Sequence, residues 1–345
     1  MRSRLLTKIS ELDIQGEIYP THRIIREDYE EEPEEFKYHP KTIFETSKAK
    51  HNTKCEPDTK YTHFKYFLDG SRRTYVIGYI SYSNKFLPIV AGQAGAACCE
   101  RTDKKISKTI LDRQVYLLLP DAIEDYELKS IRDLVKKESP TEVIVQEYKY
   151  KEVDNKPPVE YAIAKLNSIM QKKELGIIKK LSDKKLLATD QLLIADGSLQ
   201  FQKPEGINFD NVVGVAKSYK TNLSGFTIPK KQLGVILKDL KYAERTPVLQ
   251  VRDKPIGFWF VRIRQKRAVL SPLDGILKLE MYTQEQDSEL DSSIVDNVTK
   301  FLVLERNPVC YGKDDRWQNL IYPIYVTEQL LKKSFLSDRY FINLF

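Results

Sequence analysis

The sequence predicts an α/β fold in which helices flank one mixed sheet. Residues 63–120 contain strand-like runs rich in Tyr, Phe, Val and Ile with short connections, which is typical of an antiparallel meander. A long helical pattern follows, with apolar residues three and four positions apart, and it leads directly into the apolar run "LLIADG". Helical and strand-like patterns then alternate, which favours an α/β class.

The elements come in a definite order. The runs "HFKYFLDGS", "TYVIGYISYS", "FLPIVAGQAGAACCER" and "RQVYLLLP" predict strands, 121–138 a helix and "PTEVIVQEYKY" an extended piece. After the long helix come strands at "DQLLIADGS" and "NVVGVAKSY", a helix near "KKQLGVILKDL", strands at "PVLQVRD", "GFWFVRIRQ" and "GILKLEMYTQ", and helices at "SSIVDNVTKFLVLE" and "YVTEQLLKK". A meander, a crossover helix and a central strand in this order predict a ribonuclease H-like mixed sheet.

Residues 1–60 differ from the remainder. They are polar, lack a strong apolar period and include the acidic run "EDYEEEPEEF". We predict a polar N-terminal arm or interaction segment over 1–60, followed by a ribonuclease H-like α/β domain over 61–345. Mixed stretches such as "ELDIQGEIYP" often become ordered against a partner, so we expect the arm to contribute to a dimer or partner contact.

Composition excludes several classes of protein. No run of about 18 apolar residues predicts a membrane span, and the first residues turn polar too early for a signal peptide. The four cysteines lack zinc-type spacing, and Cys98 and Cys99 are interpreted as buried thiols in a cytoplasmic protein. The net charge of +7 is compatible with nucleic acid. The alternating basic run "FVRIRQKR" is interpreted as a solvated sheet face.

Several catalytic motifs are missing. All four histidines lie at or before residue 63, and the sequence has no G-x-S-x-G elbow, no phosphate loop of the G-x-x-x-x-G-K-[ST] kind and no G-x-G-x-x-G. Chemistry in this chain would therefore depend on carboxylates, which at neutral pH call for a hard divalent cation.

Two strand-like runs end in the same way, at Asp-Gly-Ser. Asp-Gly is common turn chemistry, and for a single copy that is the better interpretation. In a ribonuclease H-like sheet, however, the first meander strand lies beside the strand that follows the crossover helix. Asp69 and Asp196 would then occupy equivalent positions on strands about 4.8 Å apart, close enough to share a cation.

A third acid is expected from the long helix, where Glu174 and Glu160 are the candidates and Glu174 lies nearer the following strand. Lys217 ends the next strand-like run and would suit a scissile phosphate as a point charge, although a solvated strand-end lysine is an equal alternative. Carboxylates from two strands and one helix are what two-metal phosphodiester hydrolysis requires.

In this order, "FLDGS", "FLPIVAGQAGAA", Glu174, "LLIADGSL", "VVGVAKSY" and "YPIYVTEQLLK" resemble the NurA family of nucleases over about residues 60–335. The resemblance implies that Asp69, Glu174 and Asp196 bind Mn²⁺ or Mg²⁺ and that Lys217 lies on the phosphate side. The family's terminal motif supplies a tyrosine and a histidine. Here Tyr322 or Tyr325 matches the first, and Glu328 stands where the histidine is expected.

The resemblance also implies a further late acid, for which Glu280 and Asp296 compete. It further implies a cytoplasmic homodimer that hydrolyses DNA, in end processing or phage defence, docked on a HerA-like hexameric ATPase. Two alternatives remain: a catalytically impaired DNA-binding or assembly subunit of the same fold, and a PIWI-type module, for which the first 60 residues are too short to supply a guide-anchoring domain.

Overall fold

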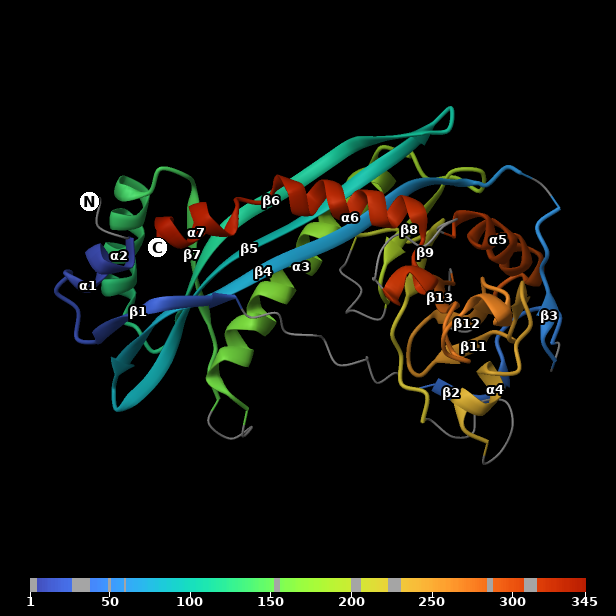
Figure 1. The fold of residues 1–345 in the computed structure, drawn as a ribbon, viewed down its shortest axis with the longest axis horizontal. Coiled ribbons are helices and arrows are strands. Elements are labelled where there is room, and N and C mark those ends of the chain that lie inside the picture. The colour runs from blue at the N-terminus through green and yellow to red at the C-terminus, as the bar shows by residue number, and fades with distance from the viewer. Residues whose placement is uncertain are drawn as a thin grey trace.

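A computed structural model describes residues 5–26, 38–48, 51–58, 60–151, 156–199, 206–222, 231–283, 288–306 and 315–345 (Figure 1). The described helices are α1 (Leu5–Ser10), α2 (Asp125–Glu138), α3 (Pro158–Asp183), α4 (Leu233–Leu237), α5 (Ser292–Glu305), α6 (Tyr322–Ser334) and α7 (Asp338–Leu344). The described strands are β1 (Glu17–Arg26), β2 (Tyr38–Ile43), β3 (Thr53–Lys54), β4 (Phe64–Tyr82), β5 (Lys85–Thr102), β6 (Lys105–Pro120), β7 (Val143–Tyr148), β8 (Leu192–Asp196), β9 (Val212–Ala216), β10 (Glu244–Arg245), β11 (Leu249–Val251), β12 (Ile256–Arg262) and β13 (Ile276–Tyr282).

One mixed sheet runs through the molecule in the order β2-β11-β12-β13-β9-β8-β4-β5-β6-β7. At its centre β4, β5 and β6 pair antiparallel, β8 is parallel to β4, and β9 is parallel to β8. The first meander strand therefore lies beside the strand that follows the long helix, as the sequence predicts. The predicted fold class, a mixed α/β sheet with flanking helices, is confirmed.

The meander is built from very long strands. The sequence predicts separate strands at "HFKYFLDGS" and "TYVIGYISYS", whereas β4 is one strand of 19 residues. That division was wrong because the Asp-Gly-Ser segment stays paired with β5, at Asp69↔Ala97 and Gly70↔Ala96, and does not turn. A local irregularity between Val76 and Gly78 bends the ladder without ending it.

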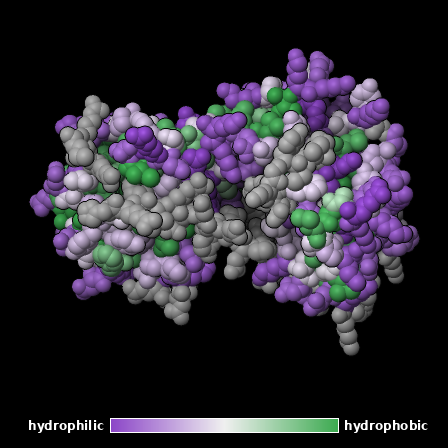
Figure 2. All heavy atoms as spheres, in the orientation of Figure 1, coloured by the Kyte–Doolittle hydropathy of each residue, from purple (hydrophilic) through white to green (hydrophobic). Residues whose placement is uncertain are grey.

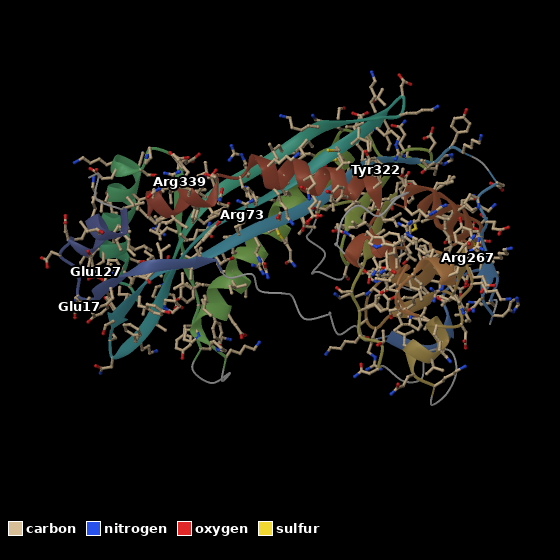
Figure 3. The ribbon with its side chains drawn as sticks, in the orientation of Figure 1. Glu17, Arg73, Glu127, Arg267, Tyr322 and Arg339 are labelled. Carbon is tan, nitrogen blue, oxygen red and sulfur yellow. The ribbon has the colours of Figure 1, made fainter. Side chains whose placement is uncertain are left out.

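Helices cover both faces of this sheet. The Cα of Gly92 in β5 faces Leu166 of α3, and a Cβ at this position would lie 2.5 Å from a leucine methyl group. The Cα of Gly95 faces Leu331 of α6, where a Cβ would lie 3.0 Å from a methyl group. Positions an odd number apart on a strand point to opposite faces, so α3 and α6 lie on opposite sides of the sheet. Arg73 of β4, labelled in Figure 3, donates to Leu336 O and Asp338 Oδ1 and ties the α6–α7 segment to the sheet.

The segment predicted as a polar arm also belongs to the sheet and its core. β1 pairs with the last part of β4, β2 pairs with β11 and β3 pairs with β10. Leu5, Leu6 and Ile9 of α1 are buried in a cluster with α2 and α7, at the end of the molecule that carries both labelled termini (Figure 1). A role for residues 1–60 in assembly stays a prediction, and the acidic run lies outside the described residues.

The solvated-face interpretation of "FVRIRQKR" was wrong. Arg262 is fully buried and donates to the carbonyls of Leu240, Leu237, Asp274 and Pro272. Arg264 is 6% exposed, donates to Trp317 O and Gln318 O and lies over the Trp317 ring. These guanidinium groups hold loop carbonyls that would otherwise be buried without partners.

Hydrophilic side chains cover most of the coloured surface in Figure 2, and the hydrophobic groups on that face are scattered in small patches. Among the described residues, no helix is long and apolar enough to cross a membrane.

Candidate active site

Three neighbouring strands bring the predicted polar residues together, within β4 and at the ends of β8 and β9. β4 and β8 are parallel, and Leu68 lies beside Ala195 in their last paired position. The next residues, Asp69 and Asp196, therefore lie at the same level of the sheet. β9 continues the arrangement with Val215 beside Asp196, and Lys217 follows its last residue. Lys217 Nζ donates to Asp196 Oδ2 at 2.9 Å.

Asp69 is the most constrained acid of this group. Asp69 is only 4% exposed, and among the described residues no hydrogen-bond donor reaches its Oδ2 atom. Burial, followed by the charge of Asp196, raises the pKa of Asp69 well above its usual range, although Lys217 opposes the shift. Glu328 and Glu174 add to the rise.

The long helix contributes Glu174 and not Glu160. A Cβ on Gly70 would lie 2.4 Å from Glu174 Oε1, so the absent side chain at position 70 is what lets this carboxylate reach the strand. Glu160 lies in the first turn of α3, fourteen positions earlier, which is about 20 Å of helix at 1.5 Å per residue. Gly70 therefore gives the Glu174 carboxylate close access to the β4 backbone beside Asp69.

Lys217 is the basic counterpart of these acids. Burial lowers the pKa of Lys217, but the charges of Asp196, Asp69 and Glu328 outweigh burial and raise it above its ordinary value. The ammonium group therefore stays protonated at neutral pH. A cavity of about 310 Å³ opens beside it, lined by residues of β4, α3, the turn after β8, the end of β9 and β13.

Helix α6 presents Glu328 toward the acids and pairs it with Lys332 one turn later. The apolar pattern of "YVTEQLLKK" predicts that Val326, Leu330 and Leu331 are buried, and this is confirmed for Leu331 alone. Pro323, Ile324, Thr327 and Leu331 are its buried residues, whereas Val326 and Leu330 are only partly covered. Tyr325 is half-buried and Tyr322 is 47% exposed, and a role for either in catalysis stays a prediction.

The two late acids lie in different surroundings. Asp296 of α5 accepts from Arg245 Nε at 2.6 Å and belongs to a separate buried ion-pair cluster with Glu45. Glu280 of β13 is fully buried and accepts from Ser198 Oγ and Leu199 N, just after Asp196. Lys278, Ser198 and Tyr282 at this place were not predicted. Ser198 belongs to the repeated Asp-Gly-Ser motif, and the signal for Lys278 and Tyr282 is the alternation of polar groups in "LKLEMY".

The donor set fits a hard cation in chemical type. Carboxylate oxygens suit Mg²⁺ and Mn²⁺. Asp69 Oδ2, which no donor of the described residues reaches, is an oxygen that a cation would satisfy. In the described part of the chain, however, no three His, Cys, Asp or Glu side chains are arranged closely enough to hold an ion as they stand.

Thiol ligands are disfavoured, since burial raises the pKa of Cys55 and of Cys98 to about 12. Cys310 lies outside the described residues.

No protein-family model and no curated protein matches the sequence. A comparison with solved structures finds the NurA nuclease from Sulfolobus solfataricus, which is 10% identical, with 79% of this chain and 80% of that chain covered and a TM-score of 0.43. A likeness of this degree does not by itself identify a family or an activity.

Proposed function

We propose that this chain is a metal-dependent deoxyribonuclease of NurA type. The observation that carries the proposal is the buried carboxylate of Asp69, which lies beside Asp196, Glu174 and Glu328. Within the described part of the chain, one of its oxygens has no hydrogen-bond donor. Buried like charges are costly, and their persistence on neighbouring strands beside a cavity is typical of functional sites. The order of the motifs that resemble NurA supports the choice of reaction.

Asp69, Glu174 and Asp196 would hold Mg²⁺ or Mn²⁺ in this site. The chemistry that such cations supply is activation of a water molecule and stabilisation of a leaving oxygen. Lys217 stays charged and would hold a phosphate oxygen of the substrate, exchanging part of its contact with Asp196 for the phosphate. Glu328 and Tyr325 on α6 would close the other side of the site.

The chain's net charge of +7 favours a polyanionic substrate. We propose linear duplex DNA, a homodimeric assembly and a HerA-like hexameric ATPase as the partner that moves the DNA, because this sequence carries no phosphate loop of its own. Its role would be DNA-end processing or phage defence.

The second candidate function is a catalytically impaired DNA-binding or assembly subunit. It is favoured by the missing histidine on α6 and by the ion pair in which Lys217 already neutralises Asp196. Duplex binding without cleavage under every cation condition would favour it over the nuclease.

The test is cleavage of end-labelled linear duplex with Mn²⁺ or Mg²⁺, with and without chelator. Asp69→Asn and Asp196→Asn should each reduce the rate at least 100-fold while the protein stays folded, because each removes ligand charge and keeps side-chain shape. Glu160→Gln, on the same helix as Glu174 but about 20 Å away, is the matched control and should cleave normally. Activity that survives chelation, or full activity in either aspartate variant, would refute the assignment.

A further inference from the structure

The chain folds back sharply immediately after Asp196. Gly197 has φ +98°, a conformation that favours glycine, and its N–H donates to Val215 O of β9 at 2.9 Å. Leu199 then lies across β9 on the bare backbone of Gly214, where a Cβ would lie 2.6 Å from Leu199 Cγ. The turn thus crosses one whole strand and reaches β13, the strand beyond it, which pairs with β9 at Glu280↔Gly214.

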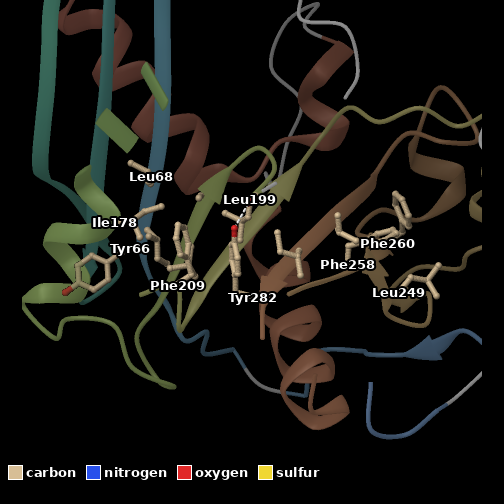
Figure 4. Close-up of a cluster of buried hydrophobic side chains, with 14 of the residues drawn as sticks. Tyr66, Leu68, Ile178, Leu199, Phe209, Leu249, Phe258, Phe260 and Tyr282 are labelled. Atoms are coloured by element: carbon tan, nitrogen blue, oxygen red, sulfur yellow. Dashed lines mark hydrogen bonds between the residues drawn. The ribbon is translucent and has the colours of Figure 1, made fainter. Parts of the chain in front are cut away.

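Two side chains of β13, those of Glu280 and Tyr282, hold this turn, and Lys278 supports Glu280. Lys278, Glu280 and Tyr282 alternate along the strand and therefore point to one face. Glu280 Oε2 accepts from Leu199 N at 2.6 Å and from Ser198 Oγ at 2.9 Å, and Glu280 Oε1 pairs with Lys278 Nζ at 2.6 Å. Tyr282 Oη donates to Leu199 O at 3.1 Å, and the two residues lie side by side in Figure 4.

Both backbone polar groups of Leu199 are therefore held by side chains of another strand. The holding groups are themselves buried: Glu280 is 0% and Lys278 1% exposed. An ion pair in such a place contributes little net stability compared with apolar residues of similar size. The pair instead fixes the geometry of the turn. A misplaced turn would deprive Glu280 Oε2 of both donors and would leave the N–H and carbonyl of Leu199 without these partners.

We propose that Glu280, supported by Lys278 and Tyr282, is a positioning residue that fixes the turn carrying Asp196. The proposal rests on the proposed function for the role of Asp196. With both carboxylate oxygens engaged, Glu280 serves as an anchor and does not add a ligand to the cation site. Holding Ser198 and Leu199 keeps the Asp196 carboxylate directed at Lys217 and level with Asp69.

Tyr282→Phe is the mildest test, since it removes one hydroxyl and keeps the ring that stacks on Phe209. The double variant Glu280→Gln/Lys278→Met removes the ion pair without leaving a buried charge. Tyr148→Phe is the matched control, because the Tyr148 hydroxyl also donates to a buried backbone carbonyl, that of Pro88, at the far end of the sheet.

The first readout is hydrogen exchange of the amides of residues 197–199 in metal-free protein. Both β13 variants should speed exchange there at least 10-fold, and the control should not. The second readout is Mn²⁺ affinity by electron paramagnetic resonance, which should weaken about 10-fold, as is usual when groups that orient metal ligands are lost. Cleavage should fall in the same variants, with the larger effect on the cation concentration needed for half-maximal rate.

Unchanged exchange in folded variants would overturn the proposal, and so would faster exchange with wild-type Mn²⁺ affinity and cleavage. The exchange measurement requires neither cation nor DNA. A wild-type protein that binds no Mn²⁺ and cleaves nothing would therefore refute the proposed function, whereas the exchange data would separately decide whether β13 holds the turn.

Discussion

Asp69 illustrates how a single residue can be retained at a cost to the fold. Its carboxylate is buried, has one oxygen without a donor among the described residues and lies near three other acids. Such a group destabilises the metal-free protein, since burial without full hydrogen bonding is unfavourable and like charges add to it. Lys217 offsets part of this charge.

Replacing Asp69 should therefore stabilise the protein. In chelator at neutral pH we expect Asp69→Asn to raise the free energy of unfolding by about 1–3 kcal/mol, because it removes an acid whose charged form is disfavoured by burial and by the neighbouring acids. Thermal denaturation measures this. Mn²⁺ should raise the melting temperature of the wild type and leave that of the variant unchanged. A lower melting temperature of the metal-free variant would show that the carboxylate is compensated.

Residue-level prediction from sequence succeeded where the neighbours follow from strand order. Asp69 and Asp196 could be placed together because each ends an apolar run that a ribonuclease H-like order makes adjacent. Arg262 and Arg264 could not be placed, since alternating basic residues look the same whether the opposite face is water or a layer of loop carbonyls. Their partners are distant in sequence, and no local pattern encodes them.

At the scale of elements, the turn after β8 depends on the strand beneath it. Gly214 is paired with Ala195 on one side and Glu280 on the other, and Leu199 occupies the space that its side chain would fill. The position of the turn is thus determined by packing as well as by hydrogen bonds.

Gly214→Ala should displace the turn and destabilise the protein by about 1–3 kcal/mol, as overpacking of a core usually does. Leu199→Ala alone should cost about 2–5 kcal/mol through the cavity it leaves. Combined, the two should cost less than their sum by at least 1 kcal/mol, because the new methyl then enters the space vacated by leucine. Denaturant titration of the double-mutant cycle measures the coupling, and additive effects would show that the two residues do not compete for space.

Helices and strands were predicted well where their periodicity is strong. The predicted helix at "SSIVDNVTKFLVLE" coincides with α5, and α3 has the expected apolar positions. The prediction of two separate strands in place of β4 was wrong. The local sequence Asp-Gly-Ser favours a turn, but its pairing with β5, at Gly70↔Ala96, keeps the segment extended. The burial of Val326 in α6 was predicted wrongly for a similar reason. Tertiary packing buries Thr327 and leaves Val326 only partly covered.

At the scale of the whole molecule, a buried ion-pair cluster joins segments far apart in sequence. Arg245 donates to both carboxylate oxygens of Glu45, at 3.0 and 2.8 Å, and to Asp296 Oδ1 of α5. Val248 N also donates to Glu45. The N-terminal segment is thereby attached to the C-terminal half of the sheet, which sequence patterns could not indicate because the pair spans 200 positions.

This cluster makes stability depend on pH in a defined direction. Burial raises the pKa of Glu45, but the Arg245 and Val248 donors outweigh it and the pKa lies below its ordinary value. Stability from Glu45 is therefore complete above its unfolded-state pKa, about 4.3, and is lost as pH falls through the lower folded-state pKa.

Glu45→Gln should accordingly lose less unfolding free energy than the wild type between pH 5 and pH 3, while being less stable at neutral pH. Exposed Glu11→Gln is the control and should follow the wild-type curve. Parallel curves for Glu45→Gln and the wild type, from chemical denaturation at each pH, would show that the ion pair does not control acid unfolding.

The fold-back over Gly214 also constrains how such a chain can diverge. Asp196 and Leu199 are three positions apart, as are Gly214 and Lys217, and each pair is held rigidly by the sheet. The connection between the two pairs can change in length at little entropic cost. A sequence that keeps this fold-back should therefore keep two short spaced signatures together, an acid with its leucine and a glycine with its lysine.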